Sequence, residues 1–73
     1  MPVQDIPAPM TGTVLEVLVA PGESVTAGQE LLVVESMKME IPLESPSAGR
    51  VAEVLVATQD RIEEGQLVLR IES

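Results

Sequence analysis

The stretch PMTGTVLEVLVA, from Pro9 to Ala20, recurs 37 positions later as PSAGRVAEVLVA, from Pro46 to Ala57. The two runs share the proline, the glycine, one valine and the whole of EVLVA. The same offset continues along the chain without a gap, so residues 1–36 and 38–73 are two copies of one unit, and Met37 stands between them. In repeats of this kind each copy is one structural unit, and neighbouring copies together bury a continuous core.

The apolar runs of each copy are typical of β-strands, because they are short, rich in Val, Ile and Leu, and bounded by turn-forming residues. Helices are disfavoured, since no N-cap precedes a run of helical period and glycines flank the runs closely. The sequence predicts strands over 3–6, 14–20, around 25 and 31–35 in the first copy, and over 40–43, 51–57, around 62 and 67–72 in the second.

Eight short strands in two copies predict an all-β fold. A single copy would leave half of its apolar face exposed, so we expect a flattened eight-stranded antiparallel barrel or sandwich of two four-stranded sheets with pseudo-twofold symmetry. The chain, 1–73, would form a single domain. Pro42 lies inside a predicted strand, which implies that this strand is at a sheet edge or that the proline nitrogen faces solvent. The symmetry also places the join around Met37 opposite the two chain ends.

Composition excludes several function classes. The chain has no cysteine, histidine or aromatic residue, so its core must be aliphatic, and neither a metal site nor a nucleophile–base–orienter set is expected. A net charge of −8 disfavours nucleic acid and anionic membranes as partners. No apolar run is long enough to span a bilayer and no secretory leader pattern opens the sequence, so we expect a cytoplasmic location.

The single lysine, Lys38, lies at the join between the copies, in the run Glu35-Ser36-Met37-Lys38-Met39-Glu40. Strands on both sides leave Met37-Lys38 as a two-residue hairpin connection around residues 36–39. Such connections favour type I′ turns with positive φ at both residues, for which Asn-Gly is the expected pair. A local rule broken at one place suggests a functional site. The alternative is a longer loop in which Met37 and Met39 only cover the end of the barrel.

The turns of the two copies differ at one position. Pro21-Gly22 is a favourable turn pair, whereas the second copy has Thr58-Gln59 there, which requires another turn geometry or backbone strain. We expect the five glycines, Gly12 and Gly49 included, to be turn formers with no chemical role.

The run Glu35-Ser36-Met37-Lys38-Met39 resembles the attachment motif, Glu-Ala/Ser-Met-Lys-Met, of the biotinyl domains of biotin-dependent carboxylases and decarboxylases. The segment Ala8-Pro9-Met10-Thr11-Gly12 resembles the Ala-Pro-Met-x-Gly entry of that family. The segment from Gly22 to Gln29 matches its Gly-Asp/Glu-x-Val-x-x-Gly-Gln/Asp stretch. The resemblance therefore covers nearly the whole chain.

This resemblance implies a non-catalytic carrier domain or subunit of a carboxylase, decarboxylase or transcarboxylase, with the biotinyl/lipoyl fold. Biotin would be attached to Lys38 as an amide by a biotin protein ligase. The domain would then carry a carboxyl group between biotin carboxylase and carboxyltransferase or decarboxylase sites. Met37, Met39 and Glu35 would be recognition elements, although a strand-end glutamate such as Glu35 can equally be a solvated surface residue.

Two alternatives remain open. Lipoyl domains, the acyl carriers of 2-oxo acid dehydrogenases, resemble biotinyl domains in fold, repeat and lysine position. They usually have aspartate before the lysine and alanine after it, where this chain has Met37 and Met39. An unmodified interaction module, in which Lys38 carries nothing, is the second alternative.

Overall fold

The computed structural model describes residues 2–73; Met1, the first residue of the predicted domain, lies outside the described residues. The described residues form eight strands and no helix, which confirms the predicted all-β class. No helix that could cross a membrane is therefore found in this part of the chain. The strands are β1 (Val3–Pro7), β2 (Gly12–Val17), β3 (Ser24–Val25), β4 (Glu30–Ser36), β5 (Met39–Glu44), β6 (Gly49–Val54), β7 (Arg61–Ile62) and β8 (Leu67–Glu72).

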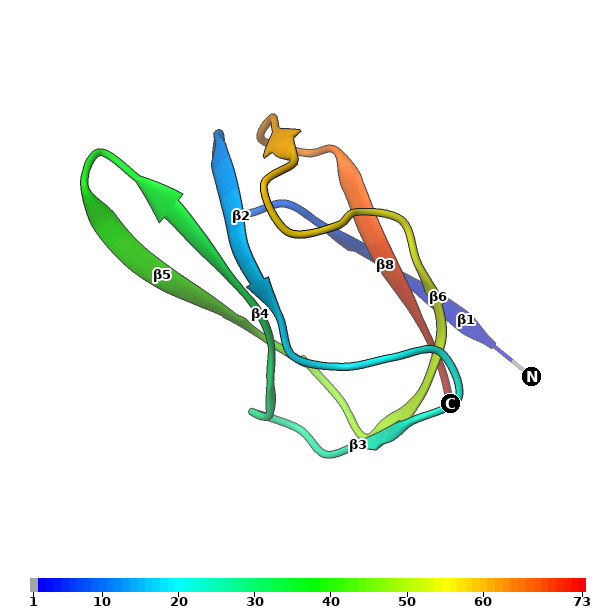
Figure 1. Cartoon of the computed structure of the whole chain (residues 1–73). Coiled ribbons are helices and arrows are strands. Elements are labelled where there is room, and N and C mark those ends of the chain that lie inside the picture. Colours follow the sequence, from blue (N-terminus) through cyan, green and yellow to red (C-terminus); the bar gives the residue numbers. More distant parts are fainter. Residues whose placement is uncertain (1) are drawn as a thin grey trace.

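The strands form two antiparallel four-stranded sheets, with the orders β1-β8-β6-β3 and β5-β4-β2-β7 (Figure 1). Strands of the two copies correspond as β1 to β5, β2 to β6, β3 to β7 and β4 to β8, so the second order is the first with each strand replaced by its counterpart. The predicted pseudo-twofold symmetry is confirmed. Each sheet takes two strands from each copy, so the copies interlock and neither forms a sheet by itself.

Aliphatic side chains from both sheets fill the space between them. None of the described core residues is larger than leucine or isoleucine, as a chain without aromatic residues requires. The buried cluster consists of Ile6, Ala8, Val14, Val19, Val25, Leu31, Leu32, Val34, Val51, Val56, Ile62, Val68, Leu69 and Ile71. Most of these residues are symmetry counterparts of one another, so the hydrophobic effect stabilises the two copies through equivalent contacts.

The second strand of each copy begins and ends earlier than predicted: β2 covers residues 12–17 rather than 14–20, and β6 covers 49–54 rather than 51–57. After β2 the chain makes one more hydrogen bond to β4, its partner strand, from the Leu18 amide to the Leu31 carbonyl at 2.9 Å. It then crosses to the other sheet, and Val19 and Val56 are buried on the way. Hydrophobicity marks these residues as buried but does not distinguish a strand from a buried crossing segment.

Two of the glycine predictions were wrong. Gly12 and Gly49 are not in turns; they open β2 and β6. A Cβ on Gly49 would lie 2.6 Å from the carbonyl oxygen of Glu72, and a Cβ on Gly12 would meet the carbonyl oxygen of Glu35. These glycines therefore allow close approach of neighbouring strands. The remaining three, Gly22, Gly28 and Gly65, lie in turns with φ of 91°, 87° and 86°.

The turn at Thr58-Gln59 has the same geometry as its counterpart at Pro21-Gly22, and its backbone is strained at Gln59. Gln59 has a φ of 80°, close to that of Gly22. The Asp60 amide donates to the Ala57 carbonyl at 3.0 Å, and the Asp60 carboxylate accepts a hydrogen bond from the Ala57 amide at 2.9 Å. These two bonds hold a backbone conformation that side-chain-bearing residues rarely adopt.

Proline lies on an outer strand of each sheet. The strand β5, which contains Pro42, is an edge strand as predicted, and its counterpart β1 ends at Pro7. Both positions limit pairing with further strands, because proline has no amide to donate.

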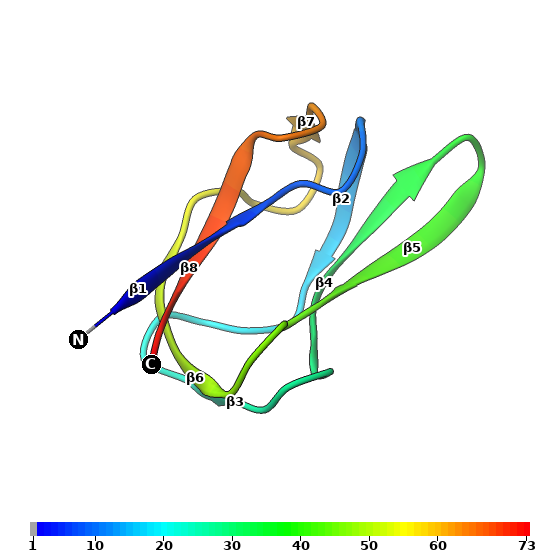
Figure 2. The same ribbon diagram turned by 180° about the vertical axis from the view of Figure 1, so that it is seen from behind.

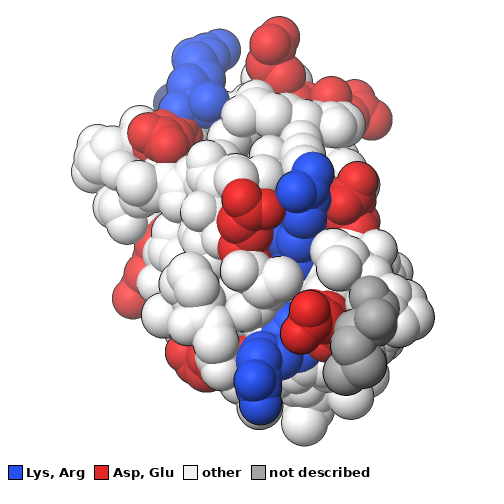
Figure 3. All heavy atoms as spheres, turned by 90° about the vertical axis from the view of Figure 1, so that its right-hand side faces the viewer, with Lys and Arg blue, Asp and Glu red and all other residues white. Residues whose placement is uncertain are grey.

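The molecule is elongated, with extents of 36 × 18 × 17 Å. The β4–β5 hairpin projects at one end, while the N- and C-terminal ends of the chain lie together near the other (Figures 1 and 2). Basic side chains lie beside acidic ones over the face formed by β1, β6 and β8 (Figure 3). The predicted separation of Lys38 from the chain ends is confirmed.

Candidate functional site

The hairpin that carries Lys38 has the predicted two-residue connection. Strand β4 ends at Ser36 and β5 begins at Met39, and these two residues face each other in the pairing register. Met37 has a φ of 53° and Lys38 a φ of 67°. Positive φ at both central residues is the type I′ pattern, which favours Asn-Gly and costs ~1–2 kcal/mol for each L-residue with a side chain. The structure therefore confirms that Met37 and Lys38, which are unfavourable residues for a type I′ turn, form one.

This turn exposes the side chains at its tip. Met37 is 91% exposed and Met39 is 63% exposed, which is unusual for large apolar residues. Lys38 is exposed as well, and neither of the ion pairs within residues 2–73 involves it. The amine is thus free to react, and it is flanked by two flexible apolar side chains that a partner protein can contact.

Glu35 and Glu40 lie directly opposite each other behind the turn. Both are exposed. Like charges opposite each other on antiparallel strands are unfavourable. The pair therefore does not stabilise the hairpin, which leaves Glu35 available for the predicted recognition role.

Thr11, in the connection between β1 and β2, holds the base of the hairpin. The Ser36 hydroxyl donates a hydrogen bond to the Thr11 carbonyl at 2.9 Å. The Glu64 amide donates to the Thr11 hydroxyl at 3.3 Å. Thr11 thus connects the hairpin to the turn between β7 and β8. Sequence reasoning missed this role, because the partners are 25 and 53 residues away in the chain and no local pattern marks them.

An open groove of about 610 Å³ lies between the hairpin and the elements joined by Thr11. Its polar and charged lining comes from Thr11, Thr13, Glu35, Ser36, Lys38, Arg61 and Glu64. Arg61 and Thr13 face each other across β7 and β2, and Thr13 faces Glu35 across β2 and β4. The groove therefore begins at Lys38 and extends across the end of one sheet. No local sequence pattern predicts this groove.

Within residues 2–73 no group of three or more acidic, histidine or cysteine side chains is arranged to hold a metal ion. The chemical group that the hairpin tip presents is one exposed primary amine, that of Lys38. An amine of this kind is a nucleophile toward an activated carboxyl group once it has lost its proton.

Comparisons with known proteins agree with this arrangement. The family model described as "Biotin-requiring enzyme" matches residues 4–71. The methylmalonyl-CoA carboxyltransferase 1.3S subunit of Propionibacterium freudenreichii subsp. shermanii is 58% identical over 36 residues, which are 49% of this chain and 29% of that subunit. The biotin carboxyl carrier protein of Streptococcus mutans serotype c is 54% identical over 35 residues, 48% of this chain and 27% of that protein. The matched stretch thus spans less than a third of either relative.

The solved structure of a single-chain, multi-domain long-chain acyl-CoA carboxylase contains a similar fold. It aligns with a TM-score of 0.88 and 33% identity, and the alignment covers 97% of this chain and 7% of that chain. The family match extends over nearly all of the described residues, and the attachment motif lies on the predicted hairpin. The chain therefore belongs to the family of biotin-requiring enzymes that share the biotinyl/lipoyl attachment domain, and is a biotinyl domain within it.

Proposed function

We propose that this domain is a biotin carboxyl carrier, with biotin attached to Lys38. The observation that supports this most is the type I′ turn at Met37-Lys38, which holds the single lysine side chain of the sequence at the tip of the hairpin. The domain then supplies the position of the amine, and the catalysis belongs to its partners.

A biotin protein ligase would supply biotin as an activated acyl adenylate. The Lys38 nitrogen would attack the acyl carbon, AMP would leave, and the lysine proton would pass to the ligase or solvent. The exposed, unpaired amine fits this step, because no ion pair within residues 2–73 has to be broken first. Met37 and Met39 would provide the apolar contact surface for the ligase, and Glu35 a charged one.

Once loaded, the domain would carry a carboxyl group on biotin between a biotin carboxylase site and a carboxyltransferase or decarboxylase site. The elongated shape supports this role, since the hairpin and the chain ends lie at opposite ends of the molecule. A tether attached at the far end keeps clear of the active sites and raises the local concentration of the cofactor toward the millimolar range.

Coexpression with an active biotin protein ligase tests the attachment. We expect the intact mass to rise by one biotinyl group, the protein to be retained on streptavidin, and peptide mapping to place the group on Lys38. The matched control, Lys38→Arg, keeps the positive charge and should show no labelling at all. A mass gain of one lipoyl group would instead support an acyl carrier, and full recovery of unmodified protein would support an interaction module.

The methionine surface is tested by the double substitution Met37→Asp with Met39→Ala. Loss of a central apolar contact should slow labelling by about tenfold or more. The matched variant, Met37→Leu with Met39→Leu, keeps the apolar area and should stay within about threefold of the native rate. Unchanged labelling of the Asp/Ala variant, in a protein with native circular dichroism, would show that the methionines are not recognised.

A further inference from the structure

The groove beside Lys38 has a distinctive charge distribution. Its lining contains two cations, Lys38 and Arg61, and two carboxylates, Glu35 and Glu64. Amide formation at Lys38 removes the first of these cations. Arg61 is then the only cation that lines the groove, which two carboxylates also line.

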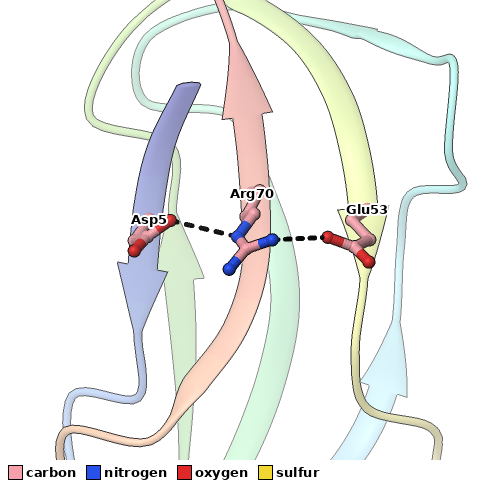
Figure 4. Close-up of polar contacts among 3 residues, drawn as sticks. All are labelled: Asp5, Glu53 and Arg70. Carbon is pink, nitrogen blue, oxygen red and sulfur yellow. Dashed lines mark hydrogen bonds and ion pairs between the residues drawn. The ribbon is translucent and has the colours of Figure 1, made fainter. Parts of the chain in front are cut away.

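Arg61 differs from Arg70 in its surroundings. The Arg70 guanidinium lies between two carboxylates, with Nε 3.1 Å from Asp5 Oδ1 and Nη1 3.0 Å from Glu53 Oε1 (Figure 4). Among residues 2–73, no such pair is formed by Arg61, although Glu64 lines the same groove. The guanidinium of Arg61 is therefore free to bind an anion.

The position of Arg61 also fits an anion that is tethered to the hairpin. Arg61 is paired with Thr13, and Thr13 is paired with Glu35 near the base of the hairpin. Two strand spacings separate Arg61 from Glu35, which is about 10 Å. Thr13 lies between them and adds a hydroxyl group to the lining.

We propose, on the basis of the carrier function above, that this groove is a resting site for the carboxylated head of the attached biotin, with Arg61 binding its carboxylate. The formal charge of the domain changes from −8 to −9 when Lys38 becomes an amide, and to −10 when biotin gains a carboxylate. An anion tethered to so acidic a domain is repelled by most of the surface. Arg61 gives it one favourable place within reach of the hairpin.

The lining of the groove makes the interaction between Arg61 and the carboxylate weak. Glu35 and Glu64 repel the same carboxylate, and Arg61 is exposed to solvent. Exposed ion pairs of this kind change an equilibrium by about two- to fivefold. Uncarboxylated biotin is neutral and gains nothing from Arg61, so the docked population should rise by about that factor on carboxylation. A carrier that must release its cargo in the next active site requires such a weak site.

The side-chain Nε–H resonances of the three arginines test this proposal by NMR. The 15N-labelled domain is biotinylated, and loading is established by intact mass. It is then carboxylated with a biotin carboxylase, MgATP and 13C-bicarbonate, and the 13C signal of the carboxyl group establishes that step. We expect the Arg61 resonance to move on carboxylation and much less on biotinylation alone, while Arg50 and Arg70 stay fixed. High salt should reduce the shift.

Two variants complete the experiment. Arg61→Gln should abolish the carboxylation-dependent shifts of the Thr11 and Glu64 amides, whereas Arg50→Gln, which removes the same charge from β6, should leave them unchanged. An unchanged Arg61 resonance in the carboxylated domain, or equal shifts of Arg50 and Arg61, would overturn the resting site. Because loading and carboxylation are measured separately, either result leaves the carrier function standing. Arg61 would then only offset the repulsion among the nearby acids.

Discussion

At the centre of one sheet, β8 carries Arg70 with its two carboxylate partners, whereas the symmetry-related position of the other sheet, on β4, carries Val33. Val33 faces Pro42 on one side and Glu16 on the other. The two sheets thus have nearly the same interior but different outer faces. Comparison of the two copies therefore distinguishes positions that the fold requires, which are the same in both, from positions that are free to differ.

The two ends of the molecule differ more strongly. At one end β4 and β5 are joined by Met37-Lys38, and the hairpin is held by the Ser36 hydroxyl bond to Thr11. At the other end the symmetry counterpart of Thr11 is Ala48, which has no hydroxyl group. The shared residues therefore maintain the sandwich, while the Thr11 contact that holds the hairpin is specific to the end where the proposed attachment occurs.

The largest expected effect concerns the strand-opening glycines. Gly12→Ala and Gly49→Ala each bring a Cβ against a backbone carbonyl, which should lower the free energy of unfolding by about 1–3 kcal/mol. Urea unfolding would measure this. Biotinylation should be slower in Gly12→Ala than in Gly49→Ala, because the added Cβ meets Glu35 beside the hairpin in the first variant and Glu72 beside the chain ends in the second. Equal slowing in both folded variants would contradict this difference.

A smaller effect is expected at the paired turns. Gly22→Ala should destabilise by about 1–2 kcal/mol through its positive φ alone, since no atom lies within 4 Å of the added Cβ. Gln59→Gly should stabilise by about 0.5 kcal/mol, because relief of strain exceeds the larger backbone entropy that glycine has in the unfolded chain. Thermal or urea unfolding would show the opposite signs. Destabilisation by Gln59→Gly would mean that the Gln59 side chain contributes more than its backbone costs.

The smallest effect is expected at the centres of the sheets. Arg70→Val, which gives β8 the residue found on β4, should change the free energy of unfolding by less than about 1 kcal/mol, because the ion pairs are exposed. The difference between native protein and variant should also shrink at high salt. A salt-independent loss of several kcal/mol would show that Arg70 packs against the sheet more than it pairs.

Much of the architecture was predictable because the repeat restricts it. The eight strands and their antiparallel two-sheet sandwich follow from the requirement that two copies bury one another's apolar faces, and the edge position of the strand with Pro42 follows from the missing proline amide. The ends of β2 and β6 were not predictable. Val19 and Val56 are buried in segments that cross between the sheets, and their hydrophobicity is the same as that of strand residues. Likewise, a sequence does not distinguish a glycine that turns from one, such as Gly12, that allows another strand to approach.

The candidate site was predictable in its local part only. Lys38 and its neighbours form a continuous motif, and the two-residue connection followed from the flanking strands. Thr11, Arg61 and Glu64 come from other elements and reach the hairpin only through the sandwich. Their contribution depends on tertiary contacts, which leave no local pattern in the chain.

The end opposite the hairpin is an incomplete copy of the hairpin. The Ser73 amide donates to the Pro2 carbonyl at 3.1 Å, and these residues are the symmetry counterparts of Ser36 and Met39. Replacing Met1 by a Met-Lys dipeptide that joins Ser73 to Pro2 would close a second turn of the same kind, producing a cyclic protein with an exposed lysine at each end. Opening that ring at the original hairpin would give a circular permutant in which carrier end and tether end have exchanged places.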